Sequence, residues 1–221
     1  METFGKKCRK ACYQSKKSDA GFTLIELLIA MAVGLVLLGA MYGVFTVHNK
    51  TFSTQEQIAE MQQNARAAMD MMTREIRMAG YNPKPYLNPT GLVVGIVSAA
   101  SDAITFTLDI TDNAGTGPPD GDTGDSNEYI TYSLYISDGI QKLGRKSTAT
   151  ANNQPVAEHV QSLAFQYRNA NGATTATTAD VRQIQVTLTV KTANPDPDYT
   201  SNGGYRTYTL TSVITPRNLG L

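Results

Sequence analysis

The feature that most constrains this chain is a 26-residue run, 22–47, that contains a single charged residue, Glu26. As an α-helix with a rise of about 1.5 Å per residue, the run extends over roughly 39 Å, which exceeds the roughly 30 Å hydrocarbon core of a bilayer. Six basic residues precede it, so the positive-inside rule predicts that the first twenty residues stay in the cytoplasm while the rest crosses. A carboxylate within a membrane segment is costly without a partner, which makes Glu26 a candidate functional residue.

A short basic leader, then Gly21, then the sequence FTLIELL at 22–28 resembles the signal of bacterial type IV prepilins and type II secretion pseudopilins. The resemblance implies that prepilin peptidase cuts between Gly21 and Phe22 and methylates the new amine of Phe22. It also implies that the apolar run is first the membrane anchor and later the filament core, with Glu26 acting in assembly. An ordinary signal anchor or secretory signal is the alternative, but a secretory signal has a shorter apolar region, has no acid and ends in a small-residue site.

Charge and cysteine content narrow the function classes. The net charge is zero, but residues 1–21 have a charge of +4 and the remainder a charge of −4. A mildly acidic chain without basic clusters argues against nucleic-acid binding by this subunit itself. Both cysteines, Cys8 and Cys12, lie in the leader, so the processed protein would have no disulfide and would depend on its own core.

Helical periodicity continues beyond the apolar run. Apolar residues recur at steps of three and four and no proline interrupts 22–79, so we expect one helix of about 58 residues. Gly80, followed by Tyr81, Asn82 and Pro83, is typical of a helix end. The apolar stripe after the anchor consists of Ile58, Met61, Ala65, Ala68, Met72, Ile76 and Ala79.

The segment 59–81 indicates which type of pilin the chain resembles. Its glutamine-rich turn and its ending, RMAGY at 77–81, are similar to the stretch after the anchor in PilW-type minor pilins. The sequence PRN at 216–218 adds a weaker similarity. Pseudopilin J of type II secretion looks related but usually lacks the Ala-Gly-Tyr ending.

From residue 92 onward the pattern has a period of two. Segments at 104–108, 129–136, 159–167, 181–190 and 205–214 are rich in Val, Ile, Thr and Tyr and predict antiparallel strands. Between 183 and 190, apolar residues alternate with Gln and Thr, as expected when one face of a sheet covers a helix.

The expected fold class is α+β, with a long N-terminal helix packed on an antiparallel β-sheet as in type IV pilins. We expect a leader at 1–21 that the peptidase removes, a transmembrane and filament-core helix at 22–47, an amphipathic continuation at 48–80 and a periplasmic β-rich domain at 81–221.

Catalytic motifs are missing from the sequence. Neither His48 nor His159 has a Ser or Cys nearby in a nucleophile motif, and phosphate loops and zinc spacings are absent, so we do not expect an enzyme. The segment 112–128 is rich in carboxylates, with Asp120, Asp122 and Asp125 as weak metal-ligand candidates. Its oxygen density would suit Ca²⁺, but it lacks EF-hand spacing and such composition more often forms a solvated loop. No other cofactor is expected.

The resemblance implies a PilW-type minor pilin that helps to initiate type IV pilus assembly near the pilus tip. Pseudopilin J of a type II secretion pseudopilus is the alternative, and a single-pass membrane enzyme or receptor is a third. The implied partners are other minor pilins, the major pilin, prepilin peptidase, the inner-membrane assembly platform and, more remotely, a tip adhesin. The implied location is the inner membrane, in a single pass with the C-terminal domain in the periplasm, and the cell-surface pilus after assembly.

Overall fold

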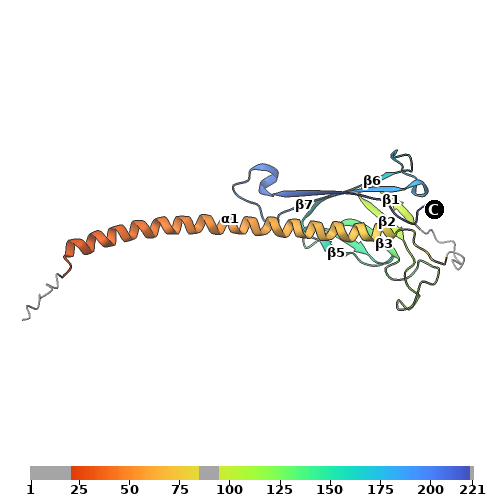
Figure 1. Ribbon diagram of the computed structural model, residues 1–221, viewed down its shortest axis with the longest axis horizontal. Coiled ribbons are helices and arrows are strands. Elements are labelled where there is room, and N and C mark those ends of the chain that lie inside the picture. The colour runs from red at the N-terminus through yellow and green to blue at the C-terminus, as the bar shows by residue number, and fades with distance from the viewer. Residues whose placement is uncertain (1–20, 85–94, 220–221) are drawn as a thin grey trace, which may run out of the picture. The chain divides into compact units, whose positions relative to one another are not determined.

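A computed structural model describes residues 21–84 and 95–219 of the 221-residue chain. The chain divides into two compact units, Met1–Lys50 and Thr51–Leu221. One helix, α1 (Leu24–Met78), belongs to both units (Figure 1). The single helix predicted over 22–79 is therefore confirmed to within two residues at each end. The leader at 1–20, with its two cysteines, lies outside the described residues.

The second half of α1 buries the stripe that the sequence predicts. The buried helix residues are Met61, Ala65, Ala68, Met69, Met72 and Ile76. Ala79 is buried just beyond the helix, Ile58 packs against the same core, and only Met69 was not foreseen. Because apolar burial stabilises a fold by about 25 cal/mol per Å², this stripe holds the helix on the rest of the second unit.

In the described part of the chain, eight strands form two antiparallel sheets. The first sheet has the order β1-β2-β3-β4-β5, and the second has the order β6-β7-β8. The strands are β1 (Ile96–Ala99), β2 (Ala103–Thr107), β3 (Tyr129–Ser137), β4 (Ile140–Lys146), β5 (Gln154–Ala157), β6 (Val160–Arg168), β7 (Gln183–Lys191) and β8 (Thr207–Ile214). Two short 3₁₀ helices, η2 (Thr178–Asp180) and η3 (Ser201–Gly204), precede β7 and β8. The α+β fold class is confirmed, with the strands divided between two sheets.

The buried side chains of α1 and of both sheets belong to one hydrophobic core. Burial alternates along β7 as predicted, with Ile184, Val186 and Leu188 inside. In the first sheet Phe106 stacks against Tyr132, with ring centroids 6.4 Å apart. The sheets are also joined by hydrogen bonds, since the Tyr167 hydroxyl donates to the Ala100 carbonyl oxygen at 2.8 Å.

The C-terminal end of α1 is closed by residues from elsewhere in the chain. Gly80 adopts a φ of 82° and donates its N–H to the Thr107 carbonyl oxygen at 2.9 Å. The Arg217 N–H donates to the Arg77 carbonyl oxygen at 3.0 Å, and Asn218 Nδ2 donates to the Met78 carbonyl oxygen at 3.3 Å. The Arg77 carbonyl, near the end of the helix, thereby gains a partner, and the Met78 carbonyl accepts from Asn218 in addition to the Tyr81 N–H. The RMAGY and PRN segments, far apart in sequence, thus form one junction.

A polar link also joins α1 to the first sheet. Arg145 on β4 donates from Nε to both carboxylate oxygens of Glu75, at 3.1 and 3.0 Å. The Tyr132 hydroxyl on β3 donates to Glu75 Oε2 at 2.6 Å. Glu75 is partly buried here and its charge is compensated by three hydrogen bonds, as a shielded carboxylate requires. The link fixes which side of α1 faces the sheet.

Candidate functional site

The bond predicted as the cleavage site lies just before α1. Phe22 is 92% exposed, and an added Cβ at Gly21 would meet no atom within 4 Å. Within the described part of the chain, therefore, no atom opposes a side chain at position 21. A requirement for glycine there would have to come from the molecule that acts on this bond.

Thr23 and Glu26 form a capping box at the start of α1. The Glu26 N–H donates to Thr23 Oγ1 at 3.3 Å, and the Thr23 N–H donates to Glu26 Oε2 at 3.0 Å. The Thr23 hydroxyl also donates to the same carboxylate oxygen at 2.9 Å. These bonds satisfy backbone donors that a helix start leaves free. The sequence analysis singled out Glu26 but missed Thr23, although the spacing Thr-x-x-Glu before an apolar run is itself a signature of this cap.

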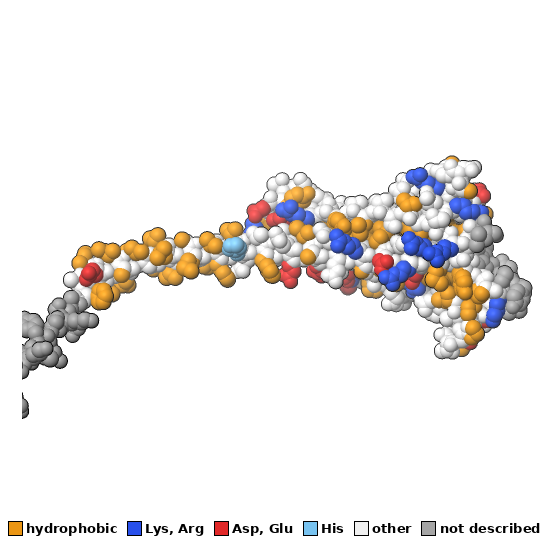
Figure 2. Space-filling view, viewed as in Figure 1, with side chains coloured by type: hydrophobic (Ala, Val, Ile, Leu, Met, Phe, Trp, Pro, Cys, Tyr) orange, Lys and Arg blue, Asp and Glu red, His pale blue; other side chains and the backbone are white. Residues whose placement is uncertain are grey.

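The first half of α1 is apolar and exposed along its length. No residue between 21 and 50 is buried, and apolar side chains cover this part of the helix (Figure 2). By length and composition α1 can cross a membrane. The apolar window is not covered by any other described part of the chain, unlike the core helix of a soluble protein. Membrane anchoring by a single helix is the reading that accounts for this exposure.

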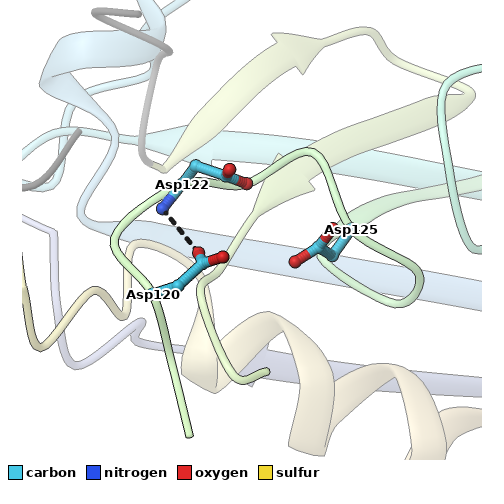
Figure 3. Close-up of side chains that lie close together, drawn as sticks. All are labelled: Asp120, Asp122 and Asp125. Atoms are coloured by element: carbon cyan, nitrogen blue, oxygen red, sulfur yellow. Dashed lines mark hydrogen bonds between the residues drawn. The ribbon is translucent and has the colours of Figure 1, made fainter. Parts of the chain in front are cut away.

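The second candidate site lies between β2 and β3. Asp120, Asp122 and Asp125 each place one carboxylate oxygen within 4.8 Å of the others (Figure 3). The Asp122 N–H donates to Asp120 Oδ1 at 3.1 Å, and the Gly124 N–H donates to Asp122 Oδ1 at 2.9 Å. The structure thus brings together the three residues that the sequence analysis named.

Two further carboxylates of this loop are fully buried, each with an exposed fraction of 0%: Asp109 and Glu128. Asp109 Oδ2 accepts the Gly121 N–H at 3.0 Å. Glu128 Oε1 accepts the N–H groups of Ile110 and Thr111 at 2.9 and 2.8 Å. Glu128 lies within the carboxylate-rich segment predicted at 112–128, but Asp109 lies outside it. Asp109 directly follows the apolar segment predicted at 104–108, and nothing in the sequence predicts its burial.

Burial and neighbouring charges shift the titration of these groups. Burial, and then the charges of Asp120 and Asp122, raise the pKa of Asp109. Burial, and then the charge of Glu128, raise the pKa of Asp125. Burial likewise raises the pKa of Glu128. In contrast, the N–H groups of Gly117 and Thr116 lower the pKa of Asp112. The interior of the loop is therefore an environment in which negative charge is poorly compensated.

Two family models match the chain. Residues 16–42 match the prokaryotic N-terminal methylation motif, and residues 54–214 match the family of prepilin peptidase-dependent protein B. The first match contains Gly21 and the capping box, and the second ends where β8 ends. Among solved structures, the chain is similar to a type IV-like pilin from Thermus thermophilus, at 13% identity and a TM-score of 0.43 over 72% of this chain and 97% of that one. No curated protein matches the chain.

Proposed function

Because the chain belongs to the prepilin peptidase-dependent protein B family of type IV pilins, we propose that it is a PilW-type minor pilin that helps to initiate pilus assembly near the tip. Members of the pilin family are structural subunits and not enzymes. The observation that supports this proposal most is the exposed apolar half of α1, which follows an accessible Gly21–Phe22 bond and continues as the core helix of a β-rich unit. Such a helix can serve first as an anchor and then as the contact between subunits.

In this proposal prepilin peptidase cuts between Gly21 and Phe22 and methylates the amine of Phe22. The basic leader is retained in the cytoplasm and the unit 51–221 lies in the periplasm, as the positive-inside rule predicts. Glycine at position 21 serves the enzyme, because a side chain beside the scissile bond would clash in a narrow protease site. The partners are the other minor pilins, the major pilin and the inner-membrane assembly platform.

Mass spectrometry of the protein coexpressed with prepilin peptidase tests the processing step. We expect loss of residues 1–21 and one methyl group on Phe22. Gly21→Ala should slow cleavage and Gly21→Leu should nearly abolish it. Gly34→Ala is the matched control, because Gly34 also has no atom within 4 Å of an added Cβ but lies inside the anchor. An intact leader in the wild type, or cleavage after Val47, would contradict the proposal.

We propose that Glu26 then sets the docking of the subunit. In the membrane its carboxylate is held by Thr23 through the two hydrogen bonds described above. An ionised carboxylate in a low dielectric attracts a cation strongly, but its desolvation costs a comparable amount. The amine that cleavage creates on Phe22 of a neighbouring subunit is the proposed cation. The pair would therefore contribute to the register of docking more than to net stability.

Glu26→Gln separates charge from helix capping. Glutamine can replace glutamate in a capping box, so the variant should keep the helix start and still be cleaved. Copurification with partner pilins, and the number of pili counted by electron microscopy, should fall. Thr23→Val is the matched variant, because it removes the hydroxyl cap and keeps the charge. Wild-type piliation in Glu26→Gln, or an equal loss in Thr23→Val alone, would contradict a role for the charge.

The Ala-Gly-Tyr ending at 79–81 favours the pilus over the type II secretion alternative, pseudopilin J. Deletion of the gene should therefore reduce the number of pili and leave secretion of folded exoproteins unchanged. The reverse result would support the pseudopilin. Neighbouring genes provide a second test, since companion minor-pilin genes favour the first function and a secretin gene favours the second.

A further inference from the structure

We propose that the loop between β2 and β3 is a calcium site in which Asp120, Asp122 and Asp125 are the ligands from side chains. The inference does not depend on the proposed role in pilus assembly. It concerns the second unit alone, and it rests on the geometry of three carboxylates and on the surroundings of two more.

The spacing of the three carboxylates suits Ca²⁺. Their ligand oxygens all lie within 4.8 Å of one another. Two oxygens that share one Ca²⁺ ion at about 2.4 Å can lie at most about 4.8 Å apart, and each pair of these three oxygens meets that condition. Figure 3 shows the carboxylates of Asp120, Asp122 and Asp125 around one space on the loop. Mg²⁺ requires shorter bonds of about 2.0 to 2.1 Å and stricter octahedral geometry, which makes it the poorer fit.

A second observation, the burial of carboxylate oxygens without donors, also points to a cation. Asp109 is completely buried, and its carboxylate is directed at the turn between Asp120 and Asp122, where Oδ2 accepts the Gly121 N–H. Within the described residues, the other oxygen, Oδ1, has no hydrogen-bond partner. The same holds for Asp125 Oδ2 and for Glu128 Oε2. Carboxylate oxygens removed from water without a donor are costly, and a bound cation is one way to compensate them.

Among the described residues, no side chain supplies that cation. The sequence from 109 to 128 contains five aspartates and one glutamate but no Lys or Arg. Among residues 21–84 and 95–219, the ion pairs do not include any of these six carboxylates. Arg145 reaches the edge of the loop, where Nη1 donates to Asn127 Oδ1 at 3.0 Å, but its charge is paired with Glu75.

A second loop, at 194–198 with aspartates at 196 and 198, shows how this chain compensates a buried carboxylate when it uses a side chain. Asp196 is buried, and Arg206 donates to its Oδ2 from Nε at 3.2 Å and from Nη2 at 2.8 Å. The loop at 109–128 has the same need and no such partner. A divalent ion, completed to six or more oxygen ligands by carbonyl groups and water, would meet it.

Protonation is the competing way to remove the charge, and the raised pKa values of Asp109 and Asp125 are compatible with either outcome. Calorimetry on the full chain in detergent, after EDTA treatment and its removal, distinguishes them. We expect one Ca²⁺ ion per chain with a dissociation constant of about 10⁻⁴ to 10⁻³ M, the range of extracellular calcium modules. CaCl₂ should also raise the melting temperature more than MgCl₂ does at the same ionic strength.

Asp122→Asn is the test variant, because the amide oxygen can still accept the Gly124 N–H that Asp122 binds. We expect calcium affinity to fall at least tenfold and the calcium-dependent rise in melting temperature to be lost. Asp180→Asn, an exposed aspartate of η2, is the control and should bind calcium as the wild type does. Circular dichroism without calcium would show that both variants are folded. If titration with calcium up to about 5 mM gave no heat, the proposal would be overturned, since weaker binding lies outside the range of such modules. Equal responses to calcium and magnesium, or equal responses of the wild type and Asp122→Asn to calcium, would overturn it too.

Discussion

Gly80 ends α1 in a conformation that residues with a side chain rarely adopt. Its φ is 82°, and an added Cβ would lie 2.8 Å from Leu219 Cδ2 and 3.1 Å from the Asn218 carbonyl oxygen. Gly139, in the turn between β3 and β4, has a similar φ of 73°, but an added Cβ there would meet no atom within 4 Å. A comparison of substitutions at the two positions therefore distinguishes the cost of backbone strain, present at both, from the cost of steric contact, present only at Gly80.

Replacing either glycine by alanine should destabilise the fold, but by different amounts. Gly139→Ala should cost about 1 to 2 kcal/mol, the strain of a left-handed residue. Gly80→Ala should cost more, because Leu219 and the backbone at Asn218 must also move. Urea unfolding of the two variants gives the comparison. Equal losses would show that the chain end is not packed against Gly80 as described.

Tyr132 makes the free energy of unfolding depend on pH in the alkaline range. Burial, and then the negative charge of Glu75, raise the pKa of Tyr132, so the folded state holds the phenolic proton more tightly than the unfolded state does. Its contribution to stability is thus fully present below pH 10, near the unfolded pKa, and is lost as pH rises further, by about 1.4 kcal/mol per pH unit.

Tyr132→Phe should therefore unfold more easily at pH 8, because Glu75 loses a hydrogen bond, yet its free energy of unfolding should fall less steeply above pH 10. Chemical denaturation at several pH values between 8 and 11.5 measures both effects. Parallel curves for the variant and the wild type would show that the hydroxyl is not buried against Glu75.

At the scale of elements, sequence periodicity predicted the helix and the strands whose apolar face packs against the core. The α1 stripe and the alternation along β7 follow from one apolar face meeting the core, and five strands were predicted within a few residues. The strands β1, β4 and β5 were missed. β4 has the sequence IQKLGRK, in which polar residues interrupt the alternation of apolar and polar residues. β5 is short and contains Pro155, a residue that argues against a strand in the sequence but is tolerated in a strand at the edge of a sheet.

The candidate sites likewise contain some residues that local sequence identifies and others that only tertiary contacts reveal. Gly21, Phe22 and Glu26 form a local motif that can be recognised from spacing, and the three-residue spacing of Thr23 from Glu26 is an equally local signal that was overlooked. Asp120, Asp122 and Asp125 were found by composition. The burial of Asp109, and the pairing of Glu75 with Arg145 across 70 residues, depend on tertiary contacts that no local pattern contains.

The helix–sheet contact can be tested with two neighbouring alanines on α1. Ala68 is buried and Ala67 is exposed, so aspartate at the two positions introduces the same charge into opposite environments. Ala68→Asp should cost more than about 4 kcal/mol or prevent folding, because it buries an unpaired charge. Ala67→Asp should cost less than about 1 kcal/mol. Thermal unfolding decides, and similar melting temperatures would mean that this face of α1 does not meet the core. The same logic predicts unfolding by Met72→Asp and Ile76→Asp.

At the scale of the whole molecule, the two units differ in what they need from their surroundings. The buried residues lie between 61 and 216, and the described part of the first unit buries none. The unit Thr51–Leu221 thus contains the hydrophobic core, while the helix before it requires a membrane or other subunits to cover its apolar side chains.

The segment 51–221 expressed alone should accordingly be soluble and unfold in one cooperative transition, since it loses no core residue. A shorter segment that begins at Ala65 should melt at a lower temperature, because it lacks Ile58 and Met61. Calorimetry and size-exclusion chromatography provide the measurements. Aggregation or non-cooperative melting of 51–221 would show that the anchor contributes to the fold.

The junction at Gly80 also constrains the order of events during biosynthesis. Asn218 closes the end of α1 by a hydrogen bond to Met78, a residue made 140 positions earlier. Contacts so distant in sequence form late, because the intervening chain must first be brought together. The end of α1 is therefore closed by residues 217 and 218 only after they have been made, long after the helix itself.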